Sequence, residues 1–134
     1  MSAGGISRFR AMQAYEATAT ADTTTTSTTD VLINSMTLTP PAGTYLAFFS
    51  STIDHSNQNV AVVCSLYVGG ALDTDTVRGP IPRTNALGAI TMSMTVAING
   101  LVVVNGSQAV EVRWKTASGT ATMHQRTLNL LRIL

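Results

Sequence analysis

Charge is the scarcest property of this chain. Of its 134 residues 11% are charged, with eight Lys and Arg against seven Asp and Glu, whereas ordinary soluble domains carry roughly 25%. Thr, followed by Ser and Asn, takes the place of the missing charge, and the hydrophobic fraction is an ordinary 45%. So little charge excludes a disordered tail, a coiled coil and a nucleic-acid clamp. It also leaves few titratable groups for acid–base catalysis.

The chain also has a single cysteine and shows no pattern of a signal peptide or a membrane span. The single cysteine, Cys64, cannot form an internal disulfide, which excludes a secreted disulfide scaffold. The first eight residues lack the apolar core of a signal peptide, and no apolar run approaches the roughly 20 residues of a membrane span. We therefore expect a protein that is made in a cytoplasm, is not exported through a signal peptide and does not enter a membrane.

The residues that catalyse reactions or bind metals are few and scattered. His55, expected in a polar loop, and His124, expected on the wet face of the last strand, have no partner at ligand spacing, so no metal site is predicted. Asp73 and Asp75 could offer oxygens to calcium, but the glycine and distant glutamate of a calcium loop are missing, and two solvated aspartates are the alternative. Cys64 lies among apolar residues, as a core thiol does. No nucleophile elbow or phosphate-binding glycine loop is present, so we predict a protein that is not an enzyme and has no cofactor.

Alternation of apolar and polar residues with a period of two dominates the chain and predicts strands. The expected strands cover residues 31–38, 43–53, 59–68, 71–77, 90–98, 110–115 and 120–134. The strand over 43–53 is apolar on both faces and should be central, whereas 71–77 should be an edge. The last strand changes its apolar phase near Asn129, which predicts a bulge there. Tight turns are expected at Gly69-Gly70, Asn99-Gly100 and Asn105-Gly106.

This spacing predicts an all-β fold, an antiparallel β-sandwich of the jelly-roll type with seven or eight strands. The inward-facing residues that should form its core are Tyr45, Phe49, Val62, Cys64, Leu66, Met92, Met94, Val96, Val112 and Trp114.

The first 29 residues differ from the rest of the chain. Residues 18–29 are a Thr-rich, low-complexity run with high β propensity and no apolar face. Such a run favours an exposed edge strand or an extended arm, with a flexible linker as the alternative. Phe9, Met12 and Tyr15 could share a short helical face. We therefore divide the chain into an N-terminal extended arm with its Thr-rich segment, 1–29, and a jelly-roll domain, 30–134.

Arginines occur singly in the arm and the loops and form no basic patch, which argues against nucleic acid and suits protein–protein contacts. Two of them flank Phe9 in the arm, and two others bracket a proline-rich loop. An ordinary solvated loop and a free tail are the alternative. The residues predicted to bind a partner are Ile6, Arg8, Phe9, Arg10, Arg78, Pro80, Ile81, Pro82 and Arg83.

Three segments together resemble a known group of proteins. They are residues 36–46 (MTLTPPAGTYL), 64–70 (CSLYVGG) and 108–116 (QAVEVRWKT), the last followed by GTAT at 119–122. Their order is similar to that in small β-sandwich domains of tailed-bacteriophage structural proteins, namely capsid decoration (cement) proteins and the heads of tail-fibre proteins. The resemblance covers about residues 30–134 and leaves the N-terminal arm outside.

The resemblance implies a homotrimer with a binding role and without a cofactor or catalytic residues. The first reading is a virion structural protein that is made in the bacterial cytoplasm, binds the outer surface of the capsid and bridges capsomers. Its partners would be the major capsid protein and further copies of itself. The alternative is a tail-fibre or receptor-binding head that contacts a host glycan or surface protein through loops 54–59, 69–76 and 78–88.

Overall fold

The computed structural model describes residues 12–84 and 91–134. Its strands run over Ala14–Ala19 (β1), Thr23–Thr25 (β2), Val31–Leu38 (β3), Gly43–His55 (β4), Val62–Val68 (β5), Ala71–Leu72 (β6), Arg83–Thr84 (β7), Thr91–Met92 (β8), Met94–Val104 (β9), Val110–Thr116 (β10) and Ala121–Arg132 (β11), and a 3₁₀ helix (η2) spans Thr74–Thr76. Within the described residues, no helix is long and apolar enough to cross a membrane.

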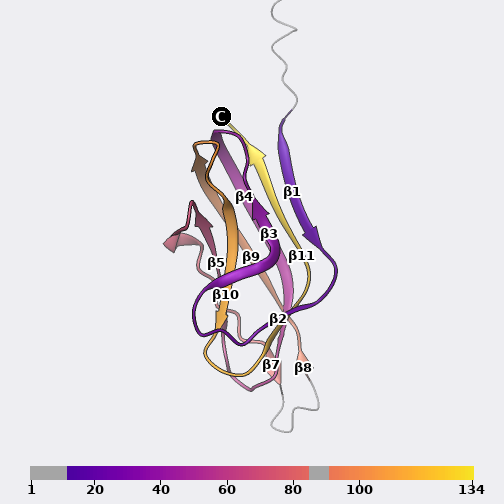
Figure 1. Cartoon of the computed structure of the whole chain (residues 1–134). Coiled ribbons are helices and arrows are strands. Elements are labelled where there is room, and N and C mark those ends of the chain that lie inside the picture. The colour runs from indigo at the N-terminus through magenta and orange to yellow at the C-terminus, as the bar shows by residue number, and fades with distance from the viewer. Residues whose placement is uncertain (1–11, 85–90) are drawn as a thin grey trace, which may run out of the picture.

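Two antiparallel sheets face each other, and a short hairpin extends from one end (Figure 1). The larger sheet has five strands in the order β1-β11-β4-β9, with β2 also paired to β11. The smaller sheet has four strands in the order β3-β10-β5-β6, and β7 pairs with β8 alone. The predicted all-β, jelly-roll-like sandwich is thereby confirmed, with β4 in the interior of its sheet as expected.

The core lies between the two sheets, where alternate residues of β4, β9 and β10 point inward. In β10 the residues Val110, Val112 and Trp114 are buried, whereas the intervening residues are half-exposed. Eight of the ten predicted core residues are buried. The two exceptions are Met92 and Met94, which are 61% and 40% exposed. The prediction that both are core residues is wrong because the strand expected over 90–98 is broken at Ser93, which places Met92 in the projecting hairpin and Met94 at the first position of β9.

The predicted turn at Asn99-Gly100 is also wrong, because both residues lie inside β9, opposite Phe48 and Ala47 of β4. A Cβ atom at Gly100 would lie 3.1 Å from Cγ2 of Thr76, so this glycine lets η2 approach the strand closely. The other two predicted turns are confirmed. Gly69 and Gly70 connect β5 to β6, and Gly106 lies between β9 and β10, all with positive φ.

The bulge in the last strand lies earlier than predicted. The register between β11 and β4 shifts between Met123 and Arg126 and is regular through Asn129. Before the shift Met123 is buried, and after it Arg126 and Leu128 are buried. The inward phase therefore changes at residues 124–125, and the apolar residues beyond Leu130 point outward near the end of the sheet.

The described part of the predicted N-terminal arm is built into the sandwich. Strand β1 pairs with β11 from Ala14 to Ala19, and β2 continues along the same strand. Tyr15 packs against the core in an edge-to-face contact with Tyr45, with ring centroids 6.0 Å apart. Over 14–19 and 23–25 the chain therefore forms strands along the edge of β11, which agrees with the edge-strand interpretation of the Thr-rich run and not with an extended arm. The short helix considered over 7–15 gives way to a strand from Ala14 onward, and its first residues lie outside the described part.

Candidate functional site

The predicted contact loop, residues 78–83, runs along the outer edge of β5 beyond the short β6 and ends in the β7–β8 hairpin. The N–H of Cys64 donates to the carbonyl of Arg78 at 2.7 Å, and the N–H of Arg78 donates back at 2.8 Å. The N–H of Val62 donates to the carbonyl of Pro80 at 2.9 Å. The loop therefore completes the edge of the smaller sheet where the short β6 ends. These three hydrogen bonds hold the backbone of the loop at Arg78 and Pro80.

Exposed apolar side chains accompany this segment. Val77 is 40% exposed and Ile81 45% exposed, and they are followed by the exposed Met92 and Met94. Arg78 and Arg83 are exposed between them, and the Arg78 guanidinium donates to the carbonyls of Asp75 and Val77. We call this set the hairpin-end surface; it consists of Val77, Arg78, Ile81, Arg83, Met92 and Met94.

The nine predicted partner-binding residues fall into four groups. Arg78, Ile81 and Arg83 are exposed, Pro80 is half-buried, and Pro82 is buried, so its ring cannot contact a partner directly. The other four, Ile6, Arg8, Phe9 and Arg10, lie outside the described residues. The two methionines were not predicted as contact residues, because their alternation with Thr and Ser is also the pattern of a core strand.

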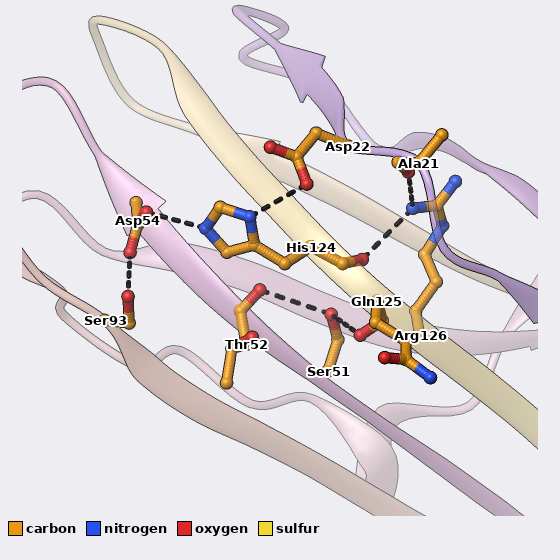
Figure 2. A network of polar contacts seen from close by, with 9 residues as sticks. All are labelled: Ala21, Asp22, Ser51, Thr52, Asp54, Ser93, His124, Gln125 and Arg126. Atoms are coloured by element: carbon orange, nitrogen blue, oxygen red, sulfur yellow. Dashed lines mark hydrogen bonds and ion pairs between the residues drawn. The ribbon is translucent and has the colours of Figure 1, made fainter.

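A polar network joins the base of the hairpin to three parts of the larger sheet (Figure 2). The hydroxyl of Ser93, which lies between β8 and β9, donates to Asp54 near the end of β4. The other carboxylate oxygen of Asp54 lies 2.6 Å from Nε2 of His124 on β11. Nδ1 of the same imidazole lies 2.9 Å from Asp22, which connects β1 to β2. Four segments far apart in the sequence therefore meet at one histidine.

The electrostatics of this network favour an imidazolium between two carboxylates. Hydrogen bonds to Asp54 and then to Asp22 raise the pKa of His124 above its ordinary value. For Asp54, burial would raise the pKa, but the hydrogen bonds from Ser93 and His124 outweigh it, and the net shift is downward. The Ser93 hydroxyl bonds to the carboxylate of Asp54 and not to the imidazole of His124. The arrangement therefore links strands and does not activate the serine as a nucleophile.

Next to this network, Arg126 is buried at the bulge, with 1% of its surface exposed. Its guanidinium donates to the carbonyls of Ala21 at 2.8 Å, Asn34 at 3.0 Å and His124 at 3.1 Å. Asn34 belongs to β3, so the side chain crosses from the larger sheet to the smaller one. Burial lowers the pKa of Arg126, and the three carbonyl dipoles take the place of water around the charge.

The structure corrects the expectation for His55 and confirms the one for Cys64. His55 was expected in a polar loop, but it ends β4 and is only 2% exposed. Its Nε2 lies 2.8 Å from Oγ1 of Thr116, and its Nδ1 accepts from the N–H of Asn57.

Cys64 is buried as predicted, and burial raises the pKa of its thiol to about 12. Among the described residues, no group of three His, Cys, Asp or Glu side chains could hold a metal ion.

Sequence reasoning missed the network and the buried arginine for different reasons. Asp22 and His124 are 102 residues apart, and no local pattern connects them. Arg126, in contrast, alternates in phase with Leu128 and Leu130, which was a usable signal that it points inward.

Comparison with known proteins supports the fold alone. No family model matches the chain, and no curated protein matches it. Its structure superimposes on the VP2 subviral particle of infectious bursal disease virus with a TM-score of 0.54 and 14% identity, over 90% of this chain and 32% of that one. A structure of the Gx strain of the same virus gives 0.54 and 12% identity over the same shares.

The chain thus spans about a third of the length of these viral chains. It has the jelly-roll-like β-sandwich fold of a viral capsid protein domain. A carbohydrate-binding module from Cellvibrio mixtus lichenase 5A also matches over 88% of this chain and 86% of that one, at 14% identity. Its TM-score of 0.37 is too low to support a functional comparison.

Proposed function

We propose that this chain is a non-catalytic structural protein of a bacteriophage virion. In this proposal it binds the outer surface of the capsid and stabilises it by bridging neighbouring capsomers. The observation that carries the proposal is the hairpin-end surface, which combines four exposed apolar side chains with two exposed arginines next to a loop that hydrogen bonds hold to β5 at Arg78 and Pro80. The capsid-like fold and the resemblance to decoration proteins support the same conclusion.

The composition of this surface suits contact with another protein. Methionine and arginine are enriched at protein interfaces, and exposed apolar residues that adjoin one another mark binding surfaces. The scarcity of charge elsewhere lets neighbouring proteins cover Thr and Ser at little desolvation cost. Repetition over many symmetry-related sites turns a modest affinity for each site into stable occupancy.

The proposed partners are the major capsid protein and further copies of this chain, in the homotrimer that the resemblance implies. The proposed location is the capsid surface of the virion. The arm residues Ile6, Arg8, Phe9 and Arg10 are proposed to add contacts from the N-terminal end.

A binding experiment with matched variants tests the surface. The double variant Ile81→Lys/Met92→Lys places two ammonium groups on the hairpin-end surface, and we expect its occupancy on capsids assembled without the chain to fall at least about tenfold, because each lysine must be desolvated on contact. The control is Leu32→Lys on β3, a residue that is 43% exposed but lies outside this surface. Unchanged occupancy of the double variant in a co-sedimentation assay would overturn the assignment of the surface.

The role itself is tested with particles that lack the chain. If it is a decoration protein, such particles lose their DNA at a lower temperature but still adsorb to host cells. Normal particle stability together with lost adsorption would refute the proposal and support a receptor-binding head of the tail.

A further inference from the structure

The two sheets have four edges, and three of them are protected against pairing with another strand. Natural sheets protect their edges with short strands, charges or bulges. Strand β6 has two residues, and the loop after it continues along β5. Strand β3 has an irregular register and a positive φ at Ser35. Strand β1 has six residues and displays Glu16 on its exposed face.

The fourth edge, β9, is neither short nor bulged and carries no charge of its own, although η2 and the carboxylate of Asp73 approach it at Gly100. It is 11 residues long and contains neither proline nor a charged residue. It pairs with β4 on one side, and on the other side it makes no backbone hydrogen bond within the described residues. Its outer backbone N–H and C=O groups are therefore available to a further strand.

The face beside this edge is apolar. Leu101 and Val103 of β9 are 58% and 66% exposed, the highest values in the strand among its large apolar residues. The register places Leu101 beside Leu46 of β4, and Leu46 beside Leu131 of β11. An apolar row thus crosses the outer face of the larger sheet and ends at the open edge. Phe48, 45% exposed, follows in the next row of β4.

We propose that β9 pairs with β9 of a second copy of this chain, antiparallel and across a two-fold axis, so that the two larger sheets become continuous. A pairing centred on Leu101 is self-complementary: each copy supplies the same uncharged edge, and the apolar rows of both copies meet on one face. No charge on the strand selects a partner of opposite sign or repels an identical one. This contact is independent of the hairpin-end surface and of the proposed function.

The assembly state tests this proposal. A two-fold contact gives an even number of chains: a dimer, or a hexamer if the trimer implied by the resemblance also forms. Light scattering of the full chain over a range of concentrations should show this species. The variant Leu101→Lys/Val103→Lys should raise its dissociation constant at least about 100-fold, because like charges of the two copies would lie opposite and diagonal to each other across the strand pair. Leu72→Lys, on the edge strand β6 and at a residue that is 41% exposed, is the control and should leave the mass unchanged.

Hydrogen exchange of the unmodified protein distinguishes strand pairing from contact through the sheet face. The amides of 94–104 should exchange more slowly as the protein concentration rises through the dissociation constant. A monomer or trimer at every concentration, an even assembly that survives the double lysine variant, or β9 amides whose exchange does not depend on concentration would each overturn the proposal. Capsid binding by the β9 variant is a separate readout, so its loss or retention bears on the proposed function alone.

Discussion

Replacing Arg126 by methionine removes a buried cation that joins the two sheets. The guanidinium donates to the carbonyls of Ala21, Asn34 and His124, and methionine fills similar space without donating. A buried acceptor without a partner costs about 1–3 kcal/mol. We take the lower value for each of the three carbonyls, or about 3 kcal/mol in total. Removing the desolvated charge offsets some of this cost. We expect Arg126→Met to lower the free energy of unfolding by about 2 kcal/mol, or roughly 7 °C in Tm.

Urea unfolding monitored by Trp114 fluorescence measures this change, which should appear as a lower midpoint with an unchanged m value. The control is Arg132→Met on the same strand, where the side chain is partly exposed and bonds to Leu134 and Gln13. We expect the control to cost less than about 1 kcal/mol. Arg126→Lys should fall between the two, because one ammonium cannot reproduce the planar fork of donors. A cost below about 0.5 kcal/mol for Arg126→Met would refute the reasoning and show that desolvating the charge consumes what its hydrogen bonds provide.

Four further results are expected. The His124–Asp54 link is complete below about pH 6.5 and is lost as the pH rises through the raised pKa of His124, so stability should fall by less than about 1 kcal/mol over that range, and His124→Gln should abolish the fall. The pKa of Asp54 is lowered, so the stability that its carboxylate contributes should be lost only at pH values below its ordinary pKa of 3.8. An NMR titration of the carboxyl measures this. Cys64, with a pKa of about 12, should not react with a disulfide reagent until the protein unfolds. Gly100→Val should lower the free energy of unfolding by about 1–3 kcal/mol in a urea titration, because its side chain would meet Thr76.

The strands could be predicted because burial on one face leaves a period of two in the sequence. Residues 110–116 show it directly, and β10 lies where the alternation places it. Strand β3 also has the predicted bounds 31–38, although its buried residues, Ile33 and Met36, are three apart. The turns at Gly69-Gly70 and Gly106 were also readable, since a positive φ there requires residues without a Cβ clash.

The errors arose where contacts distant in sequence decide the structure. Asn99-Gly100 has the composition of a hairpin turn, but its glycine is needed for the approach of η2 within a straight strand. Met92 continues the alternation of a core strand, yet the break at Ser93 moves it onto the hairpin. The network at His124 combines residues from four segments, and no local pattern brings them together.

The number of copies of this chain in each virion tests the central claim most directly. It can be measured by quantitative mass spectrometry of purified particles and placed by electron cryo-microscopy of the same sample. If the chain is a capsid decoration protein, we expect hundreds of copies on the capsid exterior, with the β7–β8 hairpin of each copy directed at the capsomers. A handful of copies confined to the tail would contradict it.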